Sequence, residues 1–459
     1  MPFPVDVAHL YSDRAISGGG LRVAALKKKL TLAPLVAATY FMVAGGPYGL
    51  EELVHKSGYL AAIAILLLVP LLWSLPTALM VGELASALPE EGGYYVWVKR
   101  ALGPFWGFQE AWLSLCASVF DMAIYPTLFV LYLSRVWPGA AGGPAALAVG
   151  VGVIVTCAAM NLRGARAVGG ASLWMAVLLL GPFVILCALA WLAPAPAASI
   201  HAVTTGGDFV GGVLIAMWNF MGWDNASTVA GEVEHPRRNY PRAMLATTAL
   251  VVLTYLLPVV AAPRTGLPIE AWTTGSWVDA GRLLGGVPLA LAVAVGGMVC
   301  SLGMMDALVM SYSRLPMVMA QDGYLPRILA RQLPTTGAPW VSILGLSVAW
   351  SLALSLGFER LIELDVILYG LALLLEFAAL LVLRVREPGM LRPFRVPGGL
   401  PVAVLLGVGP AVLLVLALAR ERHDHPDQIG AVALGVGLAC AGPMVYAVAR
   451  RVRRWSRLG

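Results

Sequence analysis

The chain has 459 residues, of which 59% are hydrophobic and 12% are charged, and its formal net charge is +6. A soluble domain carries about 25% charged residues. This composition, with a mean hydropathy of +0.81, therefore excludes an ordinary soluble domain and indicates an integral membrane protein. The positive charge is expected to reflect basic loops rather than a nucleic-acid-binding surface, so no nucleic-acid partner is expected.

Twelve apolar runs are long enough to cross a bilayer as helices, which takes about 20 residues each. They predict an all-α protein with twelve transmembrane helices at residues 30–55, 58–82, 104–136, 144–161, 168–193, 208–232, 240–262, 283–319, 340–357, 362–384, 399–419 and 428–449. The polar residues 1–29 before them predict a cytoplasmic N-terminal segment without a cleavable signal peptide. The amphipathic link 83–103 is expected at the membrane interface, partly re-entrant.

The basic residues indicate the orientation of these spans. When the twelve spans alternate across the bilayer, most of the 31 lysines and arginines fall on the side that holds both termini. Positively charged loops stay in the cytoplasm, so we expect a multi-pass protein of the cell membrane with both termini cytoplasmic. The tail 451–459 is then a basic cytoplasmic tail. Loop 231–243 is expected to be a cytoplasmic gate or turn rather than a nucleotide or lipid site, although its arginines would favour anionic lipid headgroups.

The first predicted span is interrupted near its middle by Gly45, Gly46 and Pro47. Non-helical backbone at membrane depth is tolerated only where protein or a water-filled cavity covers it. Because proline suits the first position of a helix, the motif predicts two half-helices at 30–44 and 47–56, with backbone N–H groups of the second pointing into a cavity. A simple proline kink packed against its neighbours is the alternative for this motif alone.

A second interruption lies in the sixth span, where Asn219, Gly222, Asp224 and Asn225 occupy the centre. The two interrupted spans are five apart along the chain. Broken helices at corresponding positions of two halves are the best sequence indication of a transporter binding site between inverted repeats. The pair of interruptions therefore favours two broken helices over two independent kinks.

Acidic residues fall inside the apolar runs, at Asp121, Asp224 and Asp306, and Glu110 and Glu376 lie inside or near them. A charge at the bilayer centre costs about 2.5–3.5 kcal/mol on insertion scales, so such residues face a cavity or a partner. Nearly all lysines and arginines lie in loops, so the acids indicate either a cationic substrate or carboxyl groups that bind protons. Structural alternatives remain: Asp121 would accept a hydrogen bond from a nearby Tyr or Trp, and Glu110 is expected to be structural.

No catalytic or metal-binding constellation is apparent. The six histidines lie in the N-terminal segment or in loops, and the five cysteines are scattered without a CxxC pair. An enzyme would need a clustered nucleophile and base or a metal site, and a channel would need a selectivity ring. We therefore expect no enzyme activity, no metal and no cofactor.

Several long stretches resemble one family. "GGPYGLE", "PLLWSLPTALMVGELASALPEEGGYYVWVKRALGPFWGFQEAW", "FDMAIYPTLFVLYL" and "WNFMGWDNASTVAGEVEHPRRNYPRAM" are similar to the amino acid–polyamine–organocation transporters, in particular to the plant polyamine uptake transporters and their prokaryotic relatives. The resemblance implies a LeuT-type fold in which residues 30–193 and 208–386 form a 5+5 inverted repeat and 399–450 form two peripheral spans. It also implies alternating access, with substrate between broken helices 1 and 6.

The same resemblance implies the substrate-binding residues. In the first broken helix they are Ala44, Gly45, Gly46, Pro47 and Gly49, and in the sixth they are Trp218, Asn219, Gly222, Trp223 and Asp224. Trp218 falls where relatives place an aromatic gate, and Asp224 where related exchangers have a polar residue that contacts the substrate amine. Asp121 is one position from a pocket-lining site in the third span. Tyr369 would close the extracellular side of the pocket or be a packed bundle tyrosine.

Two departures from the family pattern bear on the substrate and on its coupling. Many amino acid transporters of the superfamily have Gly-Ser-Gly in span one, whereas this chain has Gly-Gly-Pro, which favours an amine without a carboxylate. Span five has no lysine of the kind some proton-coupled relatives use, so the proton-coupling candidates are Asp306, Asp121 and Asp224.

These residues predict proton-driven uptake of polyamines or related organic cations by a secondary transporter. The ammonium groups of the substrate would lie between Asp121 and Asp224, with Trp218 and Trp223 stacked on the substrate. The alternative is an amino acid transporter or exchanger of the same superfamily, because free N–H groups in span one favour an anion. Protons and membrane lipid are the other expected partners, and no obligate protein partner is inferred.

Overall fold

The computed structural model of the protein describes residues 30–193, 207–424 and 430–455, and these residues contain helices but no β-strand. The whole predicted N-terminal segment 1–29 and the last residues of the basic tail, 456–459, lie outside the described residues. Leu30 makes an isolated parallel bridge with Val233.

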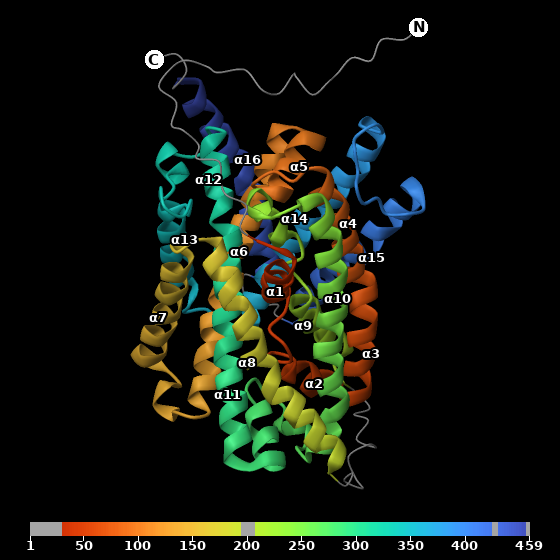
Figure 1. Ribbon diagram of the computed structural model, residues 1–459, viewed down its shortest axis with the longest axis vertical. Coiled ribbons are helices and arrows are strands. Elements are labelled where there is room, and N and C mark those ends of the chain that lie inside the picture. The colour runs from red at the N-terminus through yellow and green to blue at the C-terminus, as the bar shows by residue number, and fades with distance from the viewer. Residues whose placement is uncertain (1–29, 194–206, 425–429, 456–459) are drawn as a thin grey trace.

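The α-helices form a bundle whose long axis is vertical in Figure 1. Their bounds are α1 (Leu32–Val43), α2 (Glu51–Ser57), α3 (Tyr59–Val69), α4 (Leu75–Ala87), α5 (Gly93–Leu102), α6 (Pro104–Ser134), α7 (Gly143–Asn161), α8 (Ala165–Leu192), α9 (Phe209–Asn219), α10 (Pro236–Ala261), α11 (Trp277–Tyr312), α12 (Arg314–Gln321), α13 (Trp340–Ala353), α14 (Phe358–Arg386), α15 (Gly399–Asp424) and α16 (Ala431–Trp455). One π-helical turn, η2 (Pro70–Ser74), joins α3 to α4. The 3₁₀ segments are η3 (Pro138–Ala140), η4 (Asp224–Glu232), η5 (Ala262–Thr265), η6 (Ile269–Ala271) and η7 (Arg327–Ala330).

Nine helical stretches of the described residues are long and apolar enough to cross a membrane, and α1 and α13 are two shorter apolar helices. The outer surface of the bundle is apolar as well. Large hydrophobic side chains are exposed on several helices, among them Trp174 (74%), Leu352 (76%) and Leu192 (82%). Exposing such an apolar surface to water is unfavourable, whereas contact with lipid chains is not. The protein is therefore an all-helical, multi-pass membrane protein.

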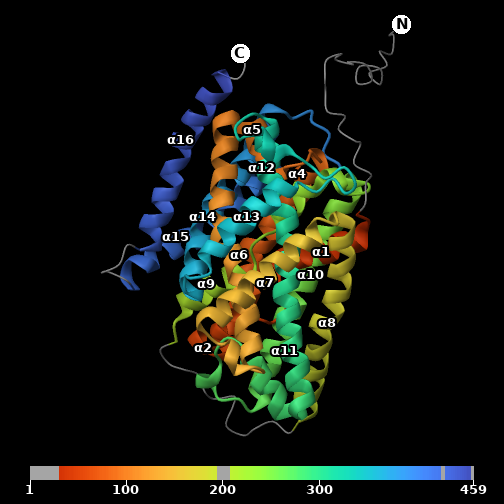
Figure 2. The same ribbon diagram turned by 90° about the vertical axis from the view of Figure 1, so that its left-hand side faces the viewer.

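The two ends of the bundle are named here for the short helices that mark them. Figure 1 places α5 and α12 at one end, called the α5 end, and α2 at the opposite end, called the α2 end. Helix α1 lies in the middle, packed against α8, α10 and α11. Turning the molecule shows α16 at the edge of the bundle (Figure 2).

The link 83–103, predicted at the membrane interface, contains the end of α4 and the short helix α5. Helix α4 continues to Ala87, residues 88–92 are not helical, and Gly93–Leu102 form α5, which packs against α6, α14 and η4. Tyr94, Tyr95 and Trp97 of α5 are completely buried. Its aromatic face therefore belongs to the core of the α5 end.

Candidate substrate-binding site

The first interruption is a true break in the helix. Helix α1 ends at Val43 because Ala44 is extended, and Gly46 and Gly49 then adopt the left-handed conformation, with φ of 69° and 92°. Helix α2 begins at Glu51, so the prediction that Pro47 starts the second half-helix is wrong. Pro47 instead begins a turn that the N–H of Leu50 closes on the Pro47 carbonyl at 3.2 Å. Residues 47–50, which the sequence pattern predicted to be helical, therefore form this turn.

The second interruption lies between α9 and η4. Helix α9 ends at Asn219, Gly222 has φ +89°, and the chain resumes as a 3₁₀ helix at Asp224. The two breaks touch each other. A Cβ added to Gly222 would overlap the carbonyl oxygen of Met42, and one added to Gly49 would lie 3.0 Å from the ring of Trp218. Glycine at both positions thus permits the close approach of the two broken helices.

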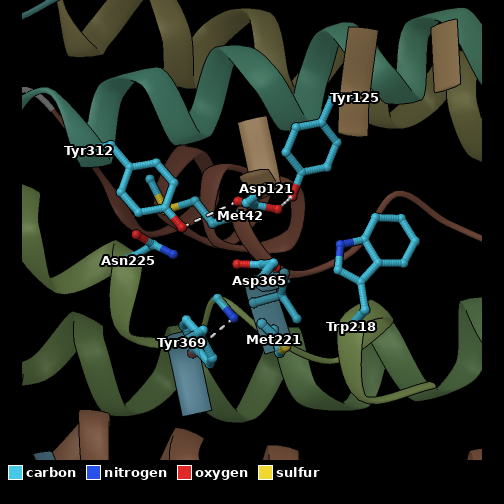
Figure 3. Close-up of a pocket in the computed structure, with 11 residues that line it drawn as sticks. Met42, Asp121, Tyr125, Trp218, Met221, Asn225, Tyr312, Asp365 and Tyr369 are labelled. Atoms are coloured by element: carbon cyan, nitrogen blue, oxygen red, sulfur yellow. Dashed lines mark hydrogen bonds between the residues drawn. The ribbon is translucent and has the colours of Figure 1, made fainter. Parts of the chain in front are cut away.

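A small inner cavity lies beside the two breaks, with a volume of about 10 Å³, roughly the space of one water molecule. It is lined by residues of α1, α6, α9, the second break, η4, α11 and α14. These residues are Met42, Val43, Asp121, Tyr125, Trp218, Met221, Gly222, Asn225, Tyr312, Asp365 and Tyr369. Figure 3 shows the carboxyl groups of Asp121 and Asp365 pointing into the same space. A substrate larger than water therefore requires this cavity to expand.

The inner cavity is acidic. Asp121 accepts hydrogen bonds from the hydroxyls of Tyr125 at 2.6 Å and Tyr312 at 3.2 Å. Asp365 is 1% exposed, and its Oδ1 atom has no hydrogen-bond partner in the described part of the chain. No lysine or arginine is among the described residues that line the cavity. A buried carboxylate without a countercharge favours either a proton or a bound cation.

Asp224 lies next to the inner cavity but does not line it. Its Oδ1 atom accepts a hydrogen bond from the hydroxyl of Tyr369, which in turn accepts one from the N–H of Gly222 at 3.0 Å. Tyr369 therefore ties the second break to α14 and stands between Asp224 and the cavity. An expanded cavity would reach Asp224 if this tyrosine moved.

The predicted site residues divide into two groups. Asp121, Trp218, Gly222 and Tyr369 line the inner cavity, and the others do not. These others are Ala44, Gly45, Gly46, Pro47, Gly49, Asn219, Trp223 and Asp224. Gly45 and Gly46 pack towards side chains of α11 and α8, and the Pro47 carbonyl accepts a hydrogen bond from Trp277 Nε1 at 2.9 Å.

On the second broken helix, Trp223 is fully buried, and its Nε1 atom donates to the carbonyl of Phe220 at 2.9 Å. Asn219 donates to the carbonyl of Ile215 at 2.8 Å. Asp306 does not line the inner cavity either. Its Oδ1 atom accepts a hydrogen bond from Asn161 at 2.7 Å, between α11 and α7.

Seven lining residues were not among the predicted site residues: Met42, Val43, Tyr125, Met221, Asn225, Tyr312 and Asp365. Asp365 has the largest chemical consequence, because it is a second carboxyl group in the cavity. The signal was present: Asp365 precedes Tyr369 by one helical turn, which puts both side chains on one face of α14. The same spacing relates Tyr125 to Asp121 on α6.

A larger outer cavity of about 470 Å³ lies at the α2 end. Its lining includes Gly49, Glu52, Arg135, Phe358 and Glu363. The ring of Phe358 packs edge-on against Trp218, with 5.9 Å between centroids and an 80° angle between planes. Because Phe358 lines the outer cavity and Trp218 lines the inner one, this pair forms part of the wall between them.

Ion pairs join distant segments of the chain at the α5 end. Glu83, fully buried, accepts hydrogen bonds from Arg384 at 2.9 and 2.5 Å and from the N–H of Val396 at 2.8 Å, and Arg392 lies 3.3 Å away. Arg314 pairs with Glu232 in the same way. Charged side chains thus cross-link segments of this end of the bundle that are distant in sequence.

Two further ion pairs lie nearer the surface of the α5 end. Lys99 pairs with Asp322, and Arg100 pairs with Glu387 at 2.6 Å. The guanidinium of Arg100 holds the pKa of the Glu387 carboxyl below its usual range, so this pair stays charged at neutral pH. Exposed pairs of this kind contribute less than the buried ones.

Comparison with known proteins places the chain in a family. The family model described as amino acid permease matches residues 36–438. Polyamine transporter PUT1 of Oryza sativa subsp. japonica is 36% identical over 436 residues, which cover 94% of this chain and 80% of that protein. Polyamine transporter RMV1 of Arabidopsis thaliana is 34% identical, covering 85% of this chain and 80% of that protein.

A bacterial relative, the uncharacterized transporter MT2055 of Mycobacterium tuberculosis, is 29% identical and covers 87% of this chain and 86% of its own. The family and these relatives are transporters, not enzymes. The matches extend over most of the sequence and confirm the resemblance seen in its motifs. The chain therefore belongs to the amino acid permease family, within the amino acid–polyamine–organocation superfamily.

Proposed function

We propose that the protein is a secondary active transporter that takes up polyamines or related organic cations by alternating access, driven by protons. The observation that carries this proposal is the inner cavity, which has two carboxyl groups, Asp121 and Asp365, and no basic side chain among its described lining residues. The names of relatives in two plants, both polyamine transporters, support the same substrate class.

The proposed architecture has twelve spans in a LeuT-type 5+5 inverted repeat. Helices α1 and α2 form the first, broken span, and α9 with η4 forms the sixth. Residues 30–193 and 208–386 are the two repeats, and α15 and α16, within 399–450, are peripheral. The cluster of arginines at the α5 end supports a cytoplasmic location for that end and for both termini, in the cell membrane.

The proposed substrate pose places one ammonium group between Asp121 and Asp365, within reach of the face of Trp218. Cation–π contact contributes about 0.5–2 kcal/mol, depending on desolvation. A second ammonium of the same molecule would reach Asp224 once Tyr369 moves. Trp223, which the sequence suggested as a second stacking residue, has no place in this pose because it is buried behind the break.

Amino acid transport is less well supported by the backbone around the breaks. The N–H of Gly49 donates to Glu51 at 2.7 Å, and the N–H of Gly222 donates to Tyr369 at 3.0 Å. Side chains of the protein thus use donors that would otherwise bind a substrate carboxylate. Amino acid transport or exchange remains the alternative outcome of the experiment below.

The experiment is a binding screen of purified protein in proteoliposomes with putrescine, spermidine, agmatine, arginine and several neutral amino acids. We expect spermidine or putrescine to stabilise the protein against heating. Asp121→Asn is expected to weaken that binding at least about tenfold, because a charge-assisted hydrogen bond contributes about 1.5–3 kcal/mol. Stabilisation by α-amino acids alone would replace polyamine transport with the alternative function.

Alternating access requires a path from the outer cavity to the inner one, and the pair of Trp218 and Phe358 blocks it. Phe358→Ala is expected to raise the dissociation rate of labelled spermidine towards the α2 side severalfold, because it removes one ring of the wall. Phe209→Ala, an exposed phenylalanine at the start of α9, is the matched control and should leave the rate unchanged. Equal rates for Phe358→Ala and the wild type would mean that substrate leaves by another route.

A further inference from the structure

A second pair of carboxyl groups lies between α6 and α14, separate from the inner cavity. Glu110 precedes Asp121 by eleven residues on α6, and Glu376 follows Asp365 by eleven residues on α14. Eleven residues are three helical turns, so each glutamate shares a helix face with its aspartate, about 16 Å away along the axis. The two helices pack against each other.

The two helices run in opposite directions. Helix α6 follows directly on α5, whereas α14 starts with Phe358 at the outer cavity and ends near Arg384 at the α5 end. Moving from Asp121 to Glu110 and from Asp365 to Glu376 therefore leads towards the same end. The fold thus builds two layers of acids, one at the inner cavity and one nearer the α5 end.

The layer nearer the α5 end, formed by Glu110 and Glu376 and called the glutamate layer, has hydrogen-bonding atoms without partners. Glu110 is fully buried and accepts one hydrogen bond, from Ser114 at 2.8 Å, and Glu376 is 1% exposed. The Oε2 atoms of both glutamates and the hydroxyl of Tyr94 have no hydrogen-bond partner within the described residues. Unpartnered buried polar atoms are rare and call for a bound species or a functional role.

The charged and titratable surroundings are all acidic or neutral. The two glutamates are close enough to interact electrostatically with each other. The same holds for three neighbours of this layer: Tyr94 from α5, Asp224 from η4 and Tyr369 from α14. Neither glutamate forms an ion pair with a described lysine or arginine. Two buried carboxylates without a countercharge are unfavourable, and binding a proton relieves both the burial and the repulsion.

We infer that Glu110 and Glu376 form a proton-binding pair that carries the coupling proton, while Asp121 and Asp365 hold the substrate. The pair takes a proton from water on one side of the membrane and returns it to water on the other, so that only O–H bonds form and break. A proton needs no cavity, which suits two carboxyl groups that are wholly enclosed, whereas an ammonium group would need space. Asp224, within electrostatic reach of the pair and one hydrogen bond from the inner cavity, links proton binding to substrate binding.

This inference rests on the proposed function, and its test compares Glu376→Gln and Glu110→Gln in proteoliposomes. Spermidine accumulation driven by a pH gradient should fall at least tenfold in either variant. Exchange of internal for external spermidine without a gradient should stay within about twofold of the wild type, which also shows that the variant is folded. Glu270→Gln, at an exposed glutamate on η6, controls for the loss of one acidic side chain.

A second readout needs no substrate. Infrared spectroscopy separates the carbonyl band of a protonated carboxylic acid from the bands of carboxylates, and Glu376→Gln should remove part of that band from protein at neutral pH. An unchanged band, or gradient-driven accumulation as steep as in the wild type, would overturn the proton pair. Loss of coupling in Asp306→Asn with both glutamine variants still coupled would also overturn it. If the wild type carries no polyamine, the proposed function fails, and the infrared band still decides the proton pair.

Discussion

Asp365→Asn is expected to weaken spermidine binding by at least about tenfold and, in the same protein, to raise the melting temperature of the substrate-free state. Affinity falls because one of the two carboxyl groups lining the inner cavity is lost, and hydrogen bonds to charged groups contribute about 1.5–3 kcal/mol. Stability rises because the carboxyl group of Asp365 is buried with an unpartnered oxygen atom in the described structure, and a neutral amide is cheaper to bury. Isothermal titration and a thermal melt measure the two effects.

The control for this prediction is Tyr312→Phe, which removes a hydrogen-bond donor to Asp121 but no charge. It should reduce affinity by much less and leave the melting temperature the same or lower. A substrate-free melting temperature that falls in Asp365→Asn would show that the carboxylate is stabilised by an interaction other than substrate. Unchanged spermidine affinity would remove Asp365 from the binding site.

Gly222→Ala is expected to abolish uptake and to destabilise the protein by about 2 kcal/mol or more. Residue 222 has φ +89°, a region that costs a non-glycine residue about 1–3 kcal/mol. The new methyl group would also overlap the Met42 carbonyl, so the two broken helices must separate. A transport assay measures the loss of uptake, and a thermal melt measures the loss of stability.

Gly152→Ala is the matched control, because a Cβ at that position of α7 meets no atom within 4 Å. Alanine is a better helix former than glycine, so this variant should transport normally and melt at the same temperature or slightly higher. Full activity in Gly222→Ala would mean that the close approach of the two breaks is not required for transport.

The sequence predicted the helical membrane bundle and the positions of both breaks, because apolar length and runs of glycine are local properties. It did not predict the end of the first break. Proline at position 47 suits both a helix start and a turn. Gly49, which is left-handed in the observed turn, lies against the ring of Trp218, a contact distant in sequence.

The partial success with the site has a similar cause. Asp121 and Trp218 were predicted because they lie deep in apolar runs or in the broken helix, where any polar or bulky group stands out. Asp365 was missed because it lies near the edge of a predicted span, where an acid needs no special explanation. Its meaning depends on α6 and α14 packing together, a contact between residues more than 200 positions apart that no local pattern contains.

The contacts of Glu83 hold several segments of the α5 end together. One carboxylate holds Arg384 through two hydrogen bonds, lies within 3.3 Å of Arg392 and accepts the Val396 N–H. Separating both arginines from Glu83 would leave a buried carboxylate without a countercharge, so half-open arrangements are expected to be the least populated. Opening at this end should therefore occur as a single switch between two states, with a rate that rises steeply with temperature, and not as a gradual widening.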